Sequence, residues 1–287
     1  MSQKVSHHQG VLYMLTSVAF FAIMNAVAKS LHHIPAHELV FFRSLIVCAI
    51  SFYYIRKLNL PIAGNNKKWL FIRGISGLTA LMLFFMTLKN IPLASATSLQ
   101  YLSPIFTVLF AVWLNKQKVK KMQWVYFAIA FCGVLCIKGF DDRISLFWLS
   151  VGITSSLIAG LAYNSIIRLR ETDHPYTIVI HLTFISLPVT FIWCLFDFVL
   201  PTGFDWLALA VMGVTTQVAQ FYATKAFISG KAAEVAPWNY VGAVLSLIIG
   251  YFLFDETITF LSIVGISLIV VSLILNSRLK EVSEINK

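Results

Sequence analysis

The feature that most constrains this chain is an almost unbroken succession of apolar segments separated by short polar breaks. Each segment is about 20 residues long, the length that an α-helix needs to cross the hydrocarbon core of a bilayer. A helix also satisfies its backbone hydrogen bonds within the segment, as a bilayer requires. We therefore predict membrane-spanning helices at residues 10–29, 36–56, 69–88, 93–114, 122–139, 146–167, 176–196, 206–228, 232–254 and 260–277.

The composition excludes a soluble globular protein. Only 12% of the residues are charged and the mean hydropathy is +0.81, whereas a typical soluble chain carries about 25% charged residues. A net charge of +10 would suggest nucleic acid in a soluble chain, but no nucleic-acid motif accompanies it, so we expect no such partner. The prediction is an all-α integral membrane protein whose surface is covered by lipid.

The basic residues predict the orientation in the membrane. With a cytoplasmic N-terminus, 15 Lys and Arg residues fall in cytoplasmic segments and 3 fall outside. Cytoplasmic loops carry the excess of Lys and Arg, so we predict a multi-pass protein of the cell (inner) membrane with both termini cytoplasmic. This orientation requires an even number of spans, and ten spans agree with it.

A weak internal repeat divides the chain into residues 1–140 and 141–287. The two halves match at a nearly constant offset of about 139 residues, the sequence signature of a repeat architecture. The matched pairs are Ser17 with Ser156, Asn25 with Asn164, Lys29 with Arg168, Tyr101 with Tyr240, Gln117 with Glu256, Trp69 with Trp206, Phe84 with Phe221, Phe85 with Tyr222 and Thr87 with Thr224.

The repeat predicts an inverted topology. Each half contains five predicted spans, and an odd number makes the second half enter the membrane from the opposite side. Transporters with inverted repeats bind substrate near the bilayer midplane, at the interface between the repeats. We therefore predict ten transmembrane helices arranged as two inverted five-helix repeats, and this arrangement favours transport over a receptor or a membrane enzyme.

Several segments resemble EamA-type carriers of the drug/metabolite transporter superfamily. They are Asn25 and Lys29, Phe41-Phe42-Arg43, residues 90–106, which resemble the family's fourth helix, and residues 250–256. The resemblance covers essentially the whole chain. It implies ten helices, a central cavity, and alternating access without ATP or a cofactor.

The chain departs from the family pattern at two places. Lys116-Gln117 stands where first halves commonly carry Gly-Glu, whereas the second half keeps Glu256. The proline usual in the ninth span is displaced to Pro237, and Ala243 occupies its place. Because proline bends helices, the ninth helix is expected to bend at a different depth from the fourth.

Polar side chains within the spans are the candidates for function, because they are costly to leave unpaired in a membrane. Arg43 either anchors an anionic or carboxylate-bearing solute or makes a structural contact, for which Glu38 is one candidate. Lys29, Arg73 and Lys225 lie near span ends, where snorkelling to the interface or a structural role is expected. Asn25 and its repeat mate suit packing between the repeats, and Asn25 is also a substrate-binding candidate.

The remaining substrate-binding candidates lie in the fourth, eighth and ninth spans. These helices face the cavity in the resembled family, and Gln217 and Gln220 can share one helix face at a spacing of three residues. The alternative for all of them is hydrogen bonding or packing between helices. The candidates are Gln100, Tyr101, Gln217, Gln220, Tyr222, Trp238, Asn239 and Tyr240.

The substrate class follows from the charges. No acidic residue lies deep in a predicted span, which disfavours proton-coupled export of organic cations. We therefore predict a secondary transporter for a small polar metabolite, amino-acid-like or an organic anion. Uptake of a nucleotide-like or vitamin-like solute is the alternative, and a channel is the alternative outside carriers. No catalytic set or metal-ligand cluster was found, so we expect neither an enzyme nor a metal site; a homodimer is left open.

Overall fold

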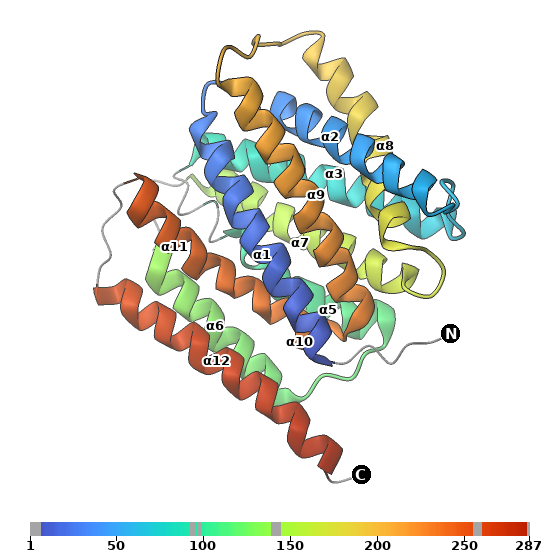
Figure 1. Ribbon diagram of the computed structural model, residues 1–287. Helices are drawn as coiled ribbons and strands as arrows, with labels where there is room; N and C mark the ends of the chain where they lie inside the picture. Colours follow the sequence, from blue (N-terminus) through green and yellow to red (C-terminus); the bar gives the residue numbers. More distant parts are fainter. Residues whose placement is uncertain (1–6, 92–95, 97–98, 139–144, 255–259, 286–287) are drawn as a thin grey trace.

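Every regular element in the described part of the chain is helical. The computed structural model describes residues 7–91, 96, 99–138, 145–254 and 260–285 (Figure 1). The elements are α1 (His7–Ser30), α2 (Ala36–Lys57), α3 (Lys67–Asn90), α5 (Ser103–Asn115), α6 (Lys121–Lys138), α7 (Leu146–Leu169), α8 (Pro175–Cys194), α9 (Asp205–Ser229), α10 (Ala232–Val235), the 3₁₀ helix η1 (Ala236–Tyr240), α11 (Val241–Phe254) and α12 (Phe260–Ile285).

Many of these helices have the length and composition of membrane spans. Among the described residues, six stretches are long and apolar enough to cross a bilayer. They are Gln9–Ser30, Ala36–Lys57, Lys67–Leu88, Leu146–Leu169, Pro175–Cys194 and Ala232–Leu253. Shorter apolar helices occupy Ser103–Asn115, Lys121–Cys136 and Phe260–Asn276. The chain is therefore a helical, multi-pass membrane protein.

Three predicted spans differ from the observed helices. Much of the early part of the predicted span 93–114 lies outside the described residues, and the helix that follows, α5, begins at Ser103 with Pro104 in its first turn. The predicted span 232–254 is not one helix, because η1 separates α10 from α11. Pro237 stands at the start of η1, where its missing N–H prevents a regular α-helical hydrogen bond. The last helix extends to Ile285 rather than ending at 277.

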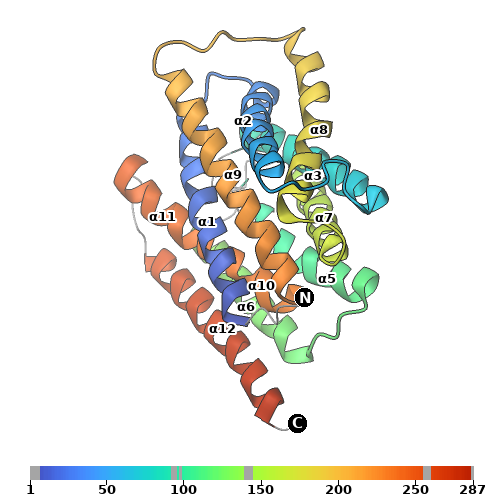
Figure 2. The same ribbon diagram turned by 45° about the vertical axis from the view of Figure 1, so that its right-hand side comes forward.

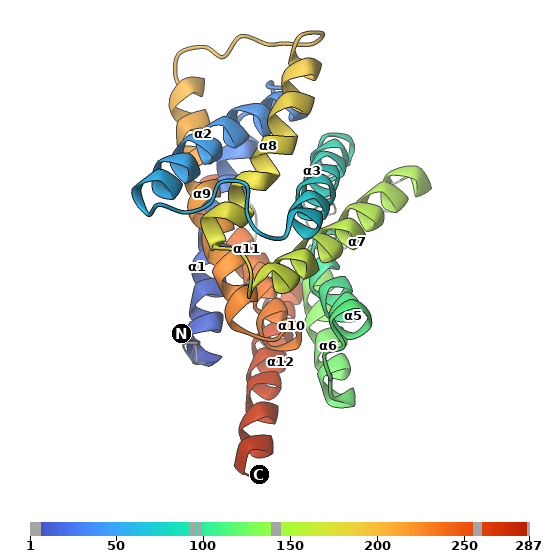
Figure 3. The same ribbon diagram turned by 90° about the vertical axis from the view of Figure 1, so that its right-hand side faces the viewer.

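The helices pack in pairs drawn from distant parts of the chain. α1 packs along α9 and α3 packs along α7, while α2 packs against α8 and α6 against α12 (Figures 1 and 2). Figure 3 shows α3 and α7 crossing on the side of the molecule away from α1. These pairings bring α1, α3, α7 and α9 around a common centre, with α2 and α8 to one side and α5 and α11 to the other.

Small residues allow the closest helix contacts. A Cβ at Gly160 of α7 would lie 2.8 Å from the Cβ of Phe106 and 3.0 Å from the backbone nitrogen of Thr107, both on α5. A Cβ at Gly133 of α6 would lie 2.7 Å from the carbonyl oxygen of Gly265 on α12. Such distances are below van der Waals contact, so only glycine lets these backbones approach this closely, as is common between membrane helices.

Candidate functional site

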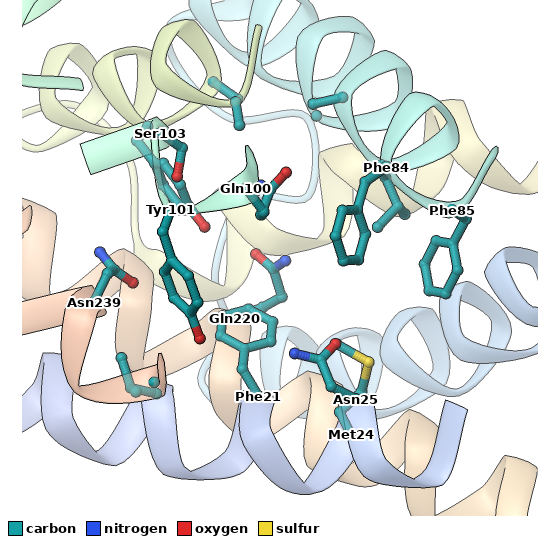
Figure 4. Close-up of a pocket in the computed structure, with 18 of the residues that line it drawn as sticks. Phe21, Met24, Asn25, Phe84, Phe85, Gln100, Tyr101, Ser103, Gln220 and Asn239 are labelled. Atoms are coloured by element: carbon teal, nitrogen blue, oxygen red, sulfur yellow. The ribbon is translucent and has the colours of Figure 1, made fainter. Parts of the chain in front are cut away.

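A cavity of about 160 Å³ lies at the centre of the helix bundle (Figure 4). Its walls come from α1, α2, α3, α5, α7, α8, α9, η1 and α11, together with the short segment that precedes α5. No acidic side chain is among the described residues that line it. Mostly apolar walls with a few convergent polar groups are typical of small-molecule sites.

The structure brings many of the predicted site residues together in this cavity. Figure 4 shows Asn25 of α1 and Gln220 of α9 projecting toward Gln100 and Tyr101 of the segment before α5. The predicted residues on the cavity wall are Asn25, Arg43, Gln100, Tyr101, Gln220 and Asn239. Amide groups that can both donate and accept hydrogen bonds therefore face the same space as a buried cation.

Arg43 lies on the cavity wall and is 3% exposed. Its Nε atom has no hydrogen-bond partner within the described part of the chain. Glu38, one candidate for a structural partner of Arg43, makes a contact elsewhere: its Oε2 atom accepts a hydrogen bond from the backbone N–H of Val199 at 3.0 Å. The interpretation that Glu38 satisfies Arg43 is not supported by this geometry, because the carboxylate is turned to the α8–α9 connection.

Four of the candidates lie away from the cavity, for reasons that helix geometry explains. Gln217 accepts a hydrogen bond from Ser51 of α2 at 3.0 Å, because a spacing of three residues turns it about 60° away from Gln220. Tyr240 is completely buried in a cluster beside Tyr101. The others, Tyr222 and Trp238, pack against Tyr13 and against the apolar clusters around η1.

Comparison with known proteins identifies the family. A sequence model of the EamA-like transporter family matches residues 8–139 and again residues 146–278. The chain belongs to the EamA-like transporter family. This membership establishes a multi-pass membrane transporter for a small molecule, not an enzyme, as the sequence resemblance predicted.

Relatives of this chain are named for different substrates. The chain is 30% identical over 279 residues to the pseudopaline exporter CntI of Pseudomonas aeruginosa, covering 95% of this chain and 97% of that protein. It is 27% identical to a riboflavin transporter of Vibrio cholerae, covering 87% of each. It is 25% identical to an S-adenosylmethionine uptake transporter of Rickettsia prowazekii, covering 86% of this chain and 85% of the other.

A solved crystal structure shares the fold of this EamA-like chain. The two superpose with a TM-score of 0.81 at 17% sequence identity, covering 96% of this chain and 99% of the other. At this identity the likeness concerns the fold alone.

Arg73, for which the sequence predicted snorkelling to the interface or a structural role, lies on the cavity wall. It is 3% exposed rather than snorkelling outward, and its Nη2 atom donates to Oε1 of Gln220 at 3.1 Å. The reason is that neighbouring helices cover this part of α3. A signal was present one turn later: Gly77 leaves open the space that the guanidinium occupies, since a Cβ there would lie 2.3 Å from Nη1. The burial of Arg73 argues against snorkelling, whereas its hydrogen bond to Gln220 agrees with the structural role that was the other expectation.

Aromatic side chains form a second group that the sequence reasoning did not assign to the site. Phe21 of α1 and Phe84 and Phe85 of α3 line the cavity beside the amides (Figure 4). Tyr163 of α7 lies on the wall as well. In an apolar chain with 24 phenylalanines, nothing local marks these residues, because only the packing of α1, α3 and α7 turns them toward one space.

Proposed function

We propose that the chain is a secondary transporter that moves a small polar metabolite, amino-acid-like or an organic anion, across the cytoplasmic membrane by alternating access. The observation that carries this proposal is the buried guanidinium of Arg43, which faces the cavity with an unpaired Nε atom. A buried charge without a partner is expensive. An anionic group of the substrate would supply that partner through charge-assisted hydrogen bonds.

The proposal includes ten spans arranged as two inverted repeats, 1–140 and 141–287. The family match repeats, at residues 8–139 and 146–278. If α1, α2 and α3 are equated with α7, α8 and α9, the contact of α1 with α9 becomes the contact of α7 with α3, and both contacts exist. Likewise α2 with α9 becomes α8 with α3, again an observed pair. This exchange supports a pseudo-two-fold relation.

Two hydrogen bonds support the same relation in atomic detail. The hydroxyl of Ser17 on α1 donates to the carbonyl of Ala219 on α9 at 2.8 Å. The hydroxyl of Ser155 on α7 donates to the carbonyl of Ala80 on α3, also at 2.8 Å. By the offset of 137 that aligns α3 with α9, the acceptors deviate from the repeat by two residues, and by the offset of 139 that aligns α1 with α7, the donors deviate by one. Equivalent helix pairs are thus joined by hydroxyl-to-carbonyl hydrogen bonds at nearly equivalent positions.

The proposed orientation places both termini in the cytoplasm. The start of α1 and the end of α12 lie toward the same end of the bundle in Figures 1 and 2. This agrees with the excess of basic residues in the segments assigned to the inside. A reporter that works only in the cytoplasm should be active when it is fused to residue 287, and a reporter that works only outside the cell should be inactive there.

A second candidate function is uptake of a nucleotide-like or vitamin-like solute. The cavity favours it through Phe21, Phe84 and Tyr101, which offer faces on which a planar ring can stack. Relatives named as a riboflavin transporter and as an S-adenosylmethionine uptake transporter agree with a solute that contains a ring. Such a solute would still need a group that meets the cation at Arg43.

The test begins with a ligand screen of purified protein, because a ligand that binds the folded state raises the melting temperature. Hits are then tested in proteoliposomes for saturable counterflow. We expect saturation, which a carrier requires, and flux that rises without saturating would indicate a channel instead. Arg43→Gln should abolish transport without lowering the melting temperature, and Arg43→Lys should retain part of it, because an ammonium cannot form the bidentate pair. Equal loss of folding in both variants would make Arg43 structural.

A further inference from the structure

The cavity contains a second buried guanidinium in addition to that of Arg43. Arg73 lines the same space, and its Nε atom, like that of Arg43, has no hydrogen-bond partner within the described residues. The two charges are close enough to interact, and the hydroxyl of Tyr163 interacts electrostatically with both. The wall thus presents two cations to one small volume.

This pair is not explained by packing. Guanidinium groups stay protonated in proteins, so the cavity wall carries two positive charges, and no acidic side chain is among its described residues. Like charges in a buried site destabilise the folded protein. The hydrogen bond from Arg73 to Gln220 joins α3 to α9, but a neutral donor could make the same bond without placing a second charge beside Arg43.

We infer that the substrate is a dianion, with one anionic group bound by Arg43 and the other by Arg73. The inference deepens the proposed function and rests on it. A dianion neutralises both guanidiniums at once, whereas a monoanion leaves one charge uncompensated. The aromatic and apolar wall residues of α1 and α3 (Figure 4) would then contact the carbon framework of the dianion.

Two residues position Arg73 for this role. Gln220 accepts a hydrogen bond from Nη2, which holds one edge of the guanidinium fork and leaves Nε unpaired. Gly77 provides the space beside Nη1. A methyl group at position 77 would lie 2.3 Å from Nη1 of Arg73 and 2.6 Å from Cδ1 of Leu182 on α8. Both atoms are ends of flexible side chains, so the substitution would displace the guanidinium while keeping its charge and the helix.

The experiment uses three probes of equal size and different charge: glutarate, its monoamide and its diamide. At neutral pH these are a dianion, a monoanion and a neutral molecule. Binding to the purified full-length protein is measured from the shift in melting temperature at increasing probe concentration. We expect glutarate to bind most tightly, the monoamide less tightly and the diamide least.

The variants assign this preference to the two arginines. Arg43→Gln and Arg73→Gln should each weaken glutarate binding about tenfold to hundredfold, because each removes one charge-assisted interaction. The affinity of each variant for glutarate should then be close to its affinity for the monoamide. Gly77→Ala should weaken it without changing any charge. Arg56→Gln is the matched control, because it removes the same charge from an exposed position at the end of α2 and should preserve the ranking.

Equal shifts from glutarate and its diamide, or no shift from glutarate at millimolar concentration, would overturn the inference. So would a ranking that survives the cavity variants, or a screened ligand that is neutral and shows saturable counterflow. That last result would leave the carrier function intact. Absence of saturable counterflow for every screened ligand would instead refute the proposed function itself.

Discussion

We predict that Asn164 stabilises the fold and does not bind substrate, although its repeat mate Asn25 lies on the cavity wall. Asn164 is completely buried on α7. Its Nδ2 atom donates to the carbonyl of Thr107 at 2.8 Å, and its Oδ1 atom accepts from Nδ2 of Asn115 at 2.7 Å. Both bonds join α7 to α5. The perturbation is Asn164→Leu, which keeps the number of side-chain heavy atoms and the branch at Cγ and removes both bonds.

The expected loss can be worked from these bonds. A hydrogen bond between membrane helices contributes about 0.6 kcal/mol on average. Leaving a partly buried partner unsatisfied costs about 1–3 kcal/mol, less where the partner can turn to solvent. We expect the free energy of unfolding to fall by about 1–3 kcal/mol. On the scale of soluble domains of similar size, this lowers the melting temperature by roughly 2–12 °C.

The matched variant is Asn25→Leu, the same substitution at the repeat-related position. Because Asn25 faces the cavity, this variant should keep the melting temperature and lose substrate affinity. Thermal unfolding in detergent and counterflow in proteoliposomes are measured on both proteins. The reasoning is refuted if Asn164→Leu melts like the wild type, or if the two variants lose stability to the same extent.

Three further predictions test other parts of the fold and the site. Gly160→Ala should lower the free energy of unfolding by about 1–3 kcal/mol, because the new methyl group forces α7 away from α5. Gly10→Ala, whose methyl group meets only ordinary van der Waals contacts, should leave it unchanged. Equal melting temperatures of the two variants would contradict the argument that Gly160 permits a close helix contact. Burial and a nearby lysine lower the pKa of His174, in the loop before α8, below its ordinary 6.5. Folding therefore favours the neutral ring, and stability should fall as the pH drops below about 6.5. The variant His174→Asn, which can still cap α8, should remove that part of the pH dependence. Gln220→Leu should lower substrate affinity in counterflow, while Gln217→Leu, away from the cavity, should leave it unchanged, and identical losses would place both on the substrate path.

The sequence alone determined the class of protein and most of its helices. Segments of membrane-crossing length in a chain with 12% charged residues leave only a helical bundle in lipid. The observed α2 and α7 start at the predicted residues. Arg43 was identified for the same physical reason, since a cation within an apolar span stands out wherever the helix is placed.

The tertiary structure alone decided which helix faces surround the cavity. In a soluble protein a polar face marks the outside, but lipid is as apolar as the packed interior, so the pattern does not separate them. Phe252 is 74% exposed and Phe85 is 2% exposed, although both lie in similar apolar runs. In the same way, helix packing turned Gln217 toward α2 and Gln220 toward the cavity. It also covered Arg73 of α3, so that its guanidinium is buried at the cavity wall.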